Sequence, residues 1–360
     1  MLAFYVASPE AFSSSGASLR IPHSILRCIK IQPCPSTMPK VKRLTKSFLR
    51  LLLPVVLLVL AATSVSSVWL VHETSRPIDT GYLVTPQKYA MLSSRGAQVT
   101  EERWQSKDAT TQKGWLLRGE PNMPAVILLH KYGANRSHLL NLGVKLNEAT
   151  NFTVLMPDLR GHGNDAGEKF CTFGGCESDD VNATIEYVKG LKTSDGQFQL
   201  IGGGIGIYGL EMGALSALAT ANNPEVKAIA LDSVPADSDA MLSSAIGKRF
   251  PFARNVTEKL GQVGTYAYYY DGCYKRESAC DMAKQIGDRS VLLLAGADAR
   301  EFQESTSKLS KCFPNSVKMD SKTDLSPSGM NILNASLEVS GAYDQRVIDF
   351  FRNAFTPPVY

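Results

Sequence analysis

The stretch IGIYGLEMGALSALATA, residues 205–221, predicts a strand, a sharp turn and a helix. Glycine alternates with isoleucine and tyrosine at its start, and alanine and leucine dominate its end. Gly209 and Gly213 bracket the turn, and Glu211 stands at its centre. A strand-to-helix turn this tight needs small residues on both sides of its apex. The apex of the predicted turn therefore carries a carboxylate.

Around this stretch, apolar strands alternate with helices over residues 97–356. The segments 98–106 and 112–119 predict an opening antiparallel pair, and the remaining elements are strands at 125–130, 152–158, 226–232, 290–296 and 315–321 and helices at 136–149, 179–191 and 343–355. This alternation predicts an α/β fold with a mostly parallel sheet flanked by helices on both faces. Residues 234–289 are too many for an ordinary connection. We expect them to form a cap-like helical insertion over the carboxyl edge of the sheet.

Four short motifs follow the predicted strands in a fixed order. They are His130-Lys131-Tyr132-Gly133, the run PDLRGHG at 157–163, Gly209 to Gly213, and Asp298 after the strand LLLAG. Their order is similar to H-G-x-G, D-x-R-G-H-G, G-x-S-x-G and G-x-D in the α/β-hydrolase family, in the branch with serine peptidases and esterases. The resemblance covers roughly residues 97–356 and implies an α/β-hydrolase fold.

The resemblance also implies a role for each matching residue. Glu211 and Asp298 occupy the positions of the nucleophile and the acid of a catalytic triad. The backbone N–H groups of Tyr132 and Met212 match the oxyanion hole, which holds the developing negative charge. The residues expected to line the same site are His130, Lys131, Asp158 and His162.

Two positions depart from the chemistry of the family. Glu211 stands where serine is expected, and no histidine follows His162 in the chain to act as the base. Lys131 also replaces the glycine of H-G-x-G. We therefore expect a non-catalytic protein that binds an unknown small molecule or protein partner. The alternative is an atypical hydrolase, esterase- or peptidase-like, in which Glu211 is the nucleophile or general base.

Two other kinds of site are disfavoured. Residues 204–209 match G-x-G-x-x-G, and Asp232 follows at a suitable distance for a nucleotide-binding oxidoreductase. This motif normally opens its domain, however, whereas here two strand–helix units precede it. A metal on His130, Asp158 and His162 would lack an obvious third nitrogen or sulfur ligand. We expect neither a cofactor nor a metal.

The first 71 residues predict a membrane anchor. Residues 1–50 carry eight Lys or Arg and one acidic residue, so the rest of the chain has a net charge of −3, which argues against nucleic acid as a partner. The uncharged run 51–71 has 21 residues, close to the ~20 that span a bilayer. We favour an uncleaved signal anchor, with the N-terminus cytoplasmic and the C-terminal domain outside, over a cleaved signal peptide. Residues 1–37 are expected to be disordered, and 72–96 to be a tether.

Five cysteines follow the predicted anchor, in a region where an oxidising compartment allows disulfides. The close pairs Cys171/Cys176 and Cys273/Cys280 are the candidates from spacing alone, which would leave Cys312 free.

Overall fold

The computed structural model describes residues 40–78, 80–92, 96–164, 168–251 and 253–356. The chain divides into two compact units, residues 1–56 and 57–360. Helix α1 (Lys40–Thr74) begins in the first unit and ends in the second. The predicted disordered tail, residues 1–37, lies outside the described residues.

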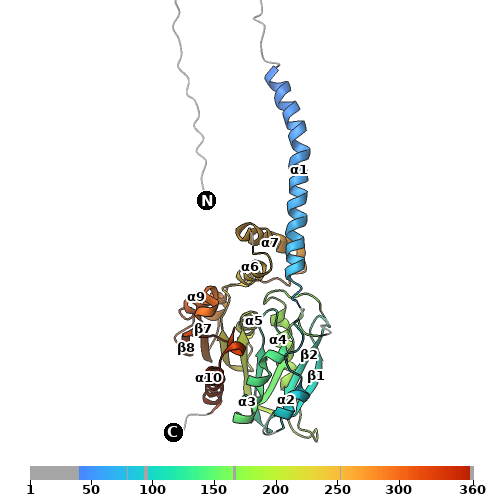
Figure 1. The fold of residues 1–360 in the computed structure, drawn as a ribbon. Coiled ribbons are helices and arrows are strands. Elements are labelled where there is room, and N and C mark those ends of the chain that lie inside the picture. Colours follow the sequence, from blue (N-terminus) through green and yellow to red (C-terminus); the bar gives the residue numbers. More distant parts are fainter. Residues whose placement is uncertain (1–39, 79, 93–95, 165–167, 252, 357–360) are drawn as a thin grey trace, which may run out of the picture. The chain divides into compact units, whose positions relative to one another are not determined.

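The described part of the second unit contains an eight-stranded sheet in the order β1-β2-β4-β3-β5-β6-β7-β8 (Figure 1). Its strands are β1 (Val99–Gln105), β2 (Thr111–Leu117), β3 (Met123–Leu129), β4 (Thr153–Pro157), β5 (Ile201–Leu210), β6 (Val226–Asp232), β7 (Ser290–Gly296) and β8 (Lys318–Leu325). The pairs β1–β2 and β2–β4 are antiparallel, and every other neighbouring pair is parallel. The sequence prediction of a mostly parallel α/β sheet is therefore confirmed.

Helices cover both faces of this sheet (Figure 1). Side chains of successive strand residues point to opposite faces, and two glycines of β5 show which helix lies on each. A Cβ at Gly206 would lie 2.7 Å from Phe351 of α10 (Leu337–Phe355), whereas one at Gly209 would lie 2.6 Å from Ala214 of α5 (Met212–Thr220). Helix α3 (Leu140–Thr150) packs beside α10, and α4 (Glu177–Lys189) beside α5.

The last elements differ in their bounds from the sequence prediction. The strand expected at 315–321 runs from Lys318 to Leu325, because its pairing with β7 begins when the Lys318 N–H donates to the Arg289 carbonyl. The closing helix begins at Leu337, six residues early, since the Ser336 hydroxyl caps it by accepting from the Val339 N–H. The short elements are α2 (Pro86–Leu92), η1 (Arg136–Leu139), α9 (Arg300–Leu309), η2 (Ala297–Ala299) and η3 (Ile332–Asn334).

Residues 234–289, called the cap below, are helical as expected. They contain α6 (Ser238–Arg249), α7 (Arg254–Tyr268) and α8 (Ala279–Lys284). Helices α6 and α7 form a close pair, since a Cβ at Gly261 would lie 2.2 Å from the Ile246 side chain. The cap joins two parallel strands: the chain leaves the sheet at the carboxyl end of β6 and returns to it at the amino end of β7, where Ser290 pairs with Ala228.

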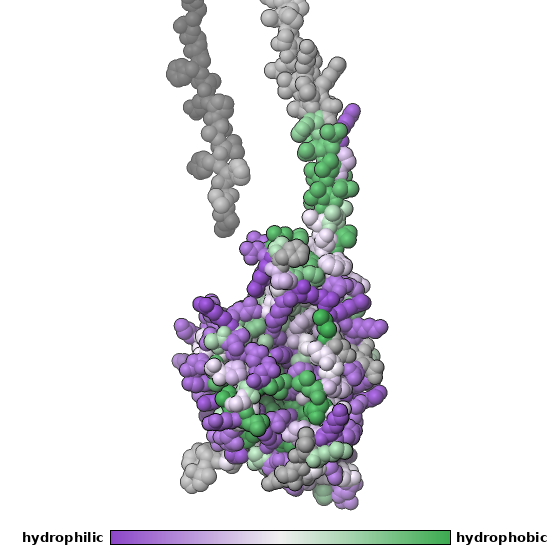
Figure 2. Space-filling model, in the orientation of Figure 1, coloured by the Kyte–Doolittle hydropathy of each residue, from purple (hydrophilic) through white to green (hydrophobic). Residues whose placement is uncertain are grey.

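Among the residues that the structure describes, one helix, Phe48–Thr74, is long and apolar enough to cross a membrane by length and composition. Its apolar side chains are exposed from Phe48 to Val65 and form the green surface of α1 in Figure 2. The segment expected to be a tether, 72–96, instead contains helical residues and contacts the domain. Its contacts include a bond from the Cys171 N–H to the Ser75 carbonyl and one from the Leu83 N–H to the Ser137 hydroxyl.

The disulfide pairing expected from spacing is wrong. Cys176 pairs with Cys273, at a Cα–Cα distance of 5.0 Å, and Cys280 pairs with Cys312, at 5.3 Å. Of the five cysteines in the described residues, only Cys171 is unpaired, and it is buried. The fold brings the cap against the start of α4 and against the end of α9, so each disulfide ties the cap to the domain. The cysteines that are close in sequence are therefore not disulfide partners.

Candidate functional site

The turn between β5 and α5 has the strained geometry that its glycines predicted. Glu211 lies at its apex with φ 53° and ψ −109°, a conformation that non-glycine residues rarely adopt. A Cβ at Gly209 would lie 2.4 Å from the Gly213 carbonyl oxygen, and a Cβ at Gly213 would lie 2.6 Å from the Leu129 carbonyl oxygen. Positions 209 and 213, two residues before and two residues after Glu211, therefore accept only glycine.

The Glu211 side chain is completely buried and has a donor on each oxygen. Oε2 accepts from the backbone N–H of Tyr132 at 3.0 Å. Oε1 forms an ion pair of 3.0 Å with the Lys248 ammonium, which comes from the last turn of α6 in the cap. A buried carboxylate needs such partners, because burying an unpaired charge is energetically costly. The cap thus supplies the charge that balances Glu211.

Tyr132 connects this carboxylate to the end of α1. Its N–H donates to Glu211, and its hydroxyl donates to the Thr74 carbonyl at 2.6 Å. Its ring stacks on Phe173 with a centroid distance of 5.8 Å. Met212, the other residue matched to the oxyanion hole, is buried at the first position of α5. The structure therefore brings Tyr132 and Glu211 into direct contact.

His130 and His162 hold two loops together by reciprocal hydrogen bonds. Nε2 of His130, after β3, accepts from the Leu159 N–H after β4 at 3.0 Å. Nε2 of His162, in the later loop, accepts from the Gly133 N–H in the earlier one, also at 3.0 Å. The Nδ1 atoms lie 2.8 Å and 2.9 Å from the Lys131 and Arg160 carbonyls, so each neutral ring donates there.

Burial keeps both imidazoles neutral. It lowers the pKa of His162 to about 4 and that of His130 well below its usual value, the neighbouring ring adding to the effect at His130. Each ring has one nitrogen that donates and one that accepts from backbone, which leaves no lone pair for a metal. Among the residues that the structure describes, no group of three His, Cys, Asp or Glu could hold an ion.

Asp158 lies in the same loop region but is engaged elsewhere. Its Oδ1 accepts from the Arg136 N–H at 2.8 Å, and its Oδ2 accepts from the Tyr82 hydroxyl at 2.9 Å. Burial raises the pKa of Asp158, an effect that the Arg136 charge opposes. Its contacts join η1 to the segment before β1, which is a structural role.

Asp298 binds the loop that follows β8. Its Oδ1 accepts from the Ser328 N–H at 2.9 Å, and its Oδ2 accepts from the Ser328 hydroxyl at 3.0 Å and the Asn331 amide at 2.8 Å. Partial burial raises the pKa of Asp298, but these hydrogen bonds outweigh it and the net shift is downward. Ser328 therefore lies directly beside Asp298, the residue at the acid position of the triad.

A buried acid that sequence reasoning did not assign to this site lies beneath the same loop. Asp232, at the end of β6, accepts from the Gly329 N–H at 2.8 Å and from the Tyr343 hydroxyl at 2.5 Å. The Tyr343 hydroxyl lies 2.9 Å from that of Tyr208. Burial raises the pKa of Asp232. Its position at a strand end is the available signal, but in the sequence the same residue also fits the acidic position of the nucleotide-binding motif.

The glycine motif at 204–209 does not form a phosphate-binding turn. Residues 204–209 lie inside β5, where Gly206 and Gly209 pair with β6. The turn comes after them, at Glu211, and its apex is acidic. A pyrophosphate would meet a carboxylate at the start of α5, which opposes the nucleotide-binding interpretation.

Two hollows flank Glu211, which lines neither of them. One, of about 750 Å³, is open and polar, with Lys248, Asp298 and Phe302 in its wall. The other, of about 250 Å³, lies between α3 and α10, and its walls are mostly apolar, including Leu139, Leu142, Leu333 and Leu337. Lys131 and Met330 line both hollows, and the Lys131 ammonium donates to the Met330 carbonyl between them. Burial lowers the pKa of Lys131, and the nearby Glu211 charge opposes this shift.

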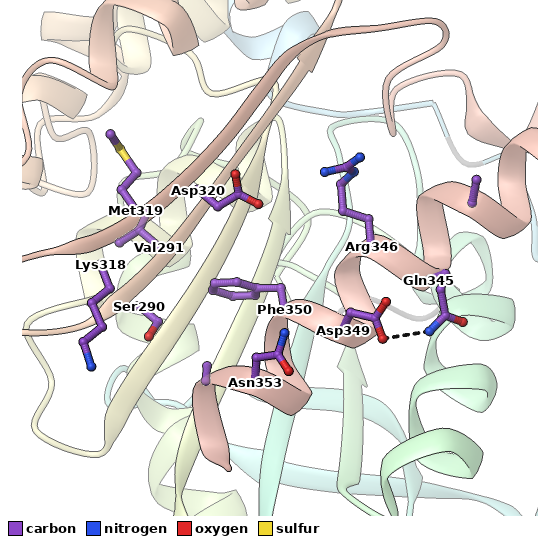
Figure 3. Close-up of a pocket in the computed structure, with 12 residues that line it drawn as sticks. Ser290, Val291, Lys318, Met319, Asp320, Gln345, Arg346, Asp349, Phe350 and Asn353 are labelled. Carbon is purple, nitrogen blue, oxygen red and sulfur yellow. Dashed lines mark hydrogen bonds between the residues drawn. The ribbon is translucent and has the colours of Figure 1, made fainter. Parts of the chain in front are cut away.

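A third hollow, of about 810 Å³, lies away from this site. Its residues include Ser290 and Lys318, which begin β7 and β8, so it is at the amino edge of the strands. Figure 3 shows Asp320, Phe350 and Arg346 around an open space between β8 and α10. The hollow lies at the opposite edge of the sheet from Glu211 and is therefore not part of the candidate site.

Solved structures of hydrolases are similar to this chain in fold. The esterase Pf2001 from Pyrococcus furiosus matches with a TM-score of 0.55 and 20% identity, over 78% of this chain and 98% of that one. The α/β hydrolase GrgF from Penicillium sp. sh18 matches with a TM-score of 0.53 and 14% identity, over 72% and 99%. A thermostable carboxyl esterase from Bacillus coagulans, in complex with glycerol, matches with a TM-score of 0.51 and 14% identity, over 72% of this chain and 99% of that one. No protein-family model matches the chain, and no curated protein matches it in sequence. The chain has the α/β-hydrolase fold.

Proposed function

From the α/β-hydrolase fold of this chain, we propose that it is a membrane-anchored protein that does not hydrolyse its ligand but binds a small, mostly apolar molecule beside a blocked catalytic position. The observation that carries the proposal is the hydrogen bond of 3.0 Å from the Tyr132 N–H to the Glu211 carboxylate. In a hydrolase of this fold that N–H would hold the oxygen of the reacting carbonyl. Here the protein's own negative charge occupies it.

The same geometry weakens the case for Glu211 as a nucleophile or general base. A nucleophile needs an oxygen directed at the substrate, whereas both Glu211 oxygens accept from donors of the protein and the side chain has no exposed surface. The acid position, Asp298, is bonded to Ser328 and Asn331. A serine hydroxyl does not accept a proton near neutral pH as imidazole does.

Ligand binding is supported by the apolar hollow between α3 and α10. Its volume of about 250 Å³ is slightly below the range of ~300–1,000 Å³ typical of drug-sized ligands, so it fits a smaller molecule. Polar side chains also line it, among them His138, Asn141 and Asp344. Such a lining favours an aliphatic molecule with one polar end.

Turnover of p-nitrophenyl acetate and p-nitrophenyl butyrate by the full chain tests the catalytic part of the proposal. We expect the natural protein, Glu211→Ala and Glu211→Gln to give the same background rate, with Glu211→Gln as the variant that preserves volume. A rate for the natural protein that both variants abolish would overturn the proposal in favour of an unorthodox hydrolase.

Thermal stabilisation by hexan-1-ol tests the ligand part. We expect Ala134→Leu, which adds volume at a buried residue lining the hollow, to remove the stabilisation. Ala149→Leu adds the same volume at an exposed position of α3 and should leave it unchanged. Equal stabilisation of all three proteins would show that the alcohol does not bind in this hollow.

A further inference from the structure

We propose that helix α7 of the cap lies on the surface of the phospholipid bilayer that α1 crosses, so that the cap is a second membrane contact of this protein. The inference rests on the membrane anchoring in the proposed function and adds a lipid-binding surface to it. It is carried by the side chains that α7 exposes and by its packing against α1.

One face of α7 exposes a stripe of apolar and aromatic side chains. Val256, Lys259, Val263 and Tyr266 recur at spacings of three, four and three residues, which places them on one side of a helix. All four are exposed, Val263 at 64% and Tyr266 at 70%, and Tyr270 beyond the helix end is exposed at 89%. The opposite side buries Gly261, Gly264 and Thr265. An apolar face directed at water is unfavourable unless something covers it.

The position of α7 identifies the bilayer as the cover. A Cβ at Gly264 would lie 2.3 Å from the Ser67 carbonyl oxygen and 3.0 Å from the Val71 side chain, so α7 crosses α1 in direct contact at this level. Counting ~20 residues from Leu51, the start of the uncharged run, a bilayer-spanning segment ends near Leu70. The contact therefore lies where hydrocarbon gives way to head groups.

The residue types around the contact are those of a membrane interface. Trp69 of α1 is 51% exposed, and its ring lies 5.6 Å from that of Phe250 at the end of α6. Trp and Tyr are enriched at the head-group level of bilayers. Lys259 within the stripe has an aliphatic stem that can lie along apolar surface while its ammonium reaches phosphate. Figure 2 shows apolar surface on the cap beside α1.

Quenching by brominated phosphatidylcholine tests this contact in the full chain. Cys28→Ser and Cys34→Ser remove the thiols before α1, and Cys171 is buried, so one introduced cysteine can carry an environment-sensitive NBD label. The label is placed at Val263→Cys on the stripe. Val65→Cys on the exposed apolar part of α1 is the positive control, and Phe198→Cys, just before β5 at the amino edge of the sheet, is the negative control.

We expect strong quenching at Val65, clear quenching at Val263 and none at Phe198. A second label on the same stripe, at Val256→Cys, should be quenched as well. Quenching at Val65 without quenching at Val263 or Val256 would overturn the inference and leave the anchor intact. Loss of quenching at Val65 as well would overturn the anchoring itself and, with it, this inference.

Discussion

Lys248 in the cap and Glu211 beneath it form a 3.0 Å ion pair in which the lysine side chain is 57% exposed and the glutamate is fully buried. The two partners are therefore not equivalent. Removing the lysine charge leaves a carboxylate buried with one backbone donor, whereas removing the glutamate charge leaves an ammonium that water can solvate. This asymmetry gives the first prediction.

Lys248→Met keeps the aliphatic stem and removes the charge. We expect it to lower the free energy of unfolding by about 1–3 kcal/mol, the cost of leaving one oxygen of the buried carboxylate without a donor. Urea denaturation measures the change. Lys284→Met, which disrupts the exposed pair with Asp281, is the matched control and should cause no measurable loss.

The double variant Glu211→Gln with Lys248→Met, together with the two single variants, forms a double-mutant cycle. Because it removes both charges, we expect it to be more stable than Lys248→Met alone. A double variant that is less stable than either single variant would contradict the importance of the unpaired carboxylate.

The imidazole of His162 predicts a loss of stability in mild acid. Its pKa is about 4 when folded against an ordinary value of 6.5, so between these values the unfolded chain binds the extra proton. The stabilisation is present above pH 6.5 and is lost as the pH falls toward 4. Between pH 7 and pH 5 the loss from this group is about 2 kcal/mol, since about 1.5 pH units are traversed below 6.5 at about 1.4 kcal/mol each.

Unfolding of the natural protein and of His162→Gln at pH 7 and pH 5 measures this contribution. The natural protein should lose about 2 kcal/mol more than the variant over this interval. Asp158 and Asp232, whose pKa values are raised by burial, act in the opposite direction in both proteins and cancel in the comparison. Equal losses would contradict a buried, neutral His162.

The two disulfides predict a defined peptide map. Under non-reducing digestion, Cys176 should be linked to Cys273 and Cys280 to Cys312, while Cys171 should react with iodoacetamide only after denaturation. The sequence separations of 97 and 32 residues correspond to about 5 and about 4 kcal/mol of loop-closure entropy in the unfolded chain. A Cys171–Cys176 peptide would contradict the fold of the cap.

Gly264→Ala and Gly341→Ala form a matched pair of helix substitutions. Alanine favours a helix over glycine by about 1 kcal/mol, and a Cβ at Gly341 in α10 meets nothing within 4 Å. Gly341→Ala should therefore raise the melting temperature. Gly264→Ala should lower it, because its Cβ would collide with the Ser67 carbonyl of α1. An increase for both variants would show that α7 does not pack against α1.

Local sequence patterns were sufficient for the fold and for the turn at Glu211. Apolar runs mark buried parallel strands because both faces of such strands are covered, and the glycines at 209 and 213 mark the turn because nothing larger fits there. The polar edge strand β8 was displaced in the prediction because its side chains are mostly exposed and carry no apolar pattern.

Partners brought together by the cap could not be predicted. Lys248 lies 37 residues after Glu211, and Cys273 lies 97 residues after Cys176, so neither pairing leaves a local signal. Both depend on how α6 and α7 fold back over the sheet. The role of Ser328 beside Asp298 likewise depends on a loop conformation that no spacing specifies.

Because the Tyr132 hydroxyl donates to the Thr74 carbonyl, a cut at the end of α1 affects the domain itself. Proteolytic shedding at the end of α1 would remove the backbone that supports Tyr132, the residue whose N–H also binds Glu211. It would remove Ser67 and Val71 from the surface of α7 at the same time. A shed form of this protein would therefore be altered at its own site, and a soluble fragment that retains the native arrangement has to begin upstream of Ser67.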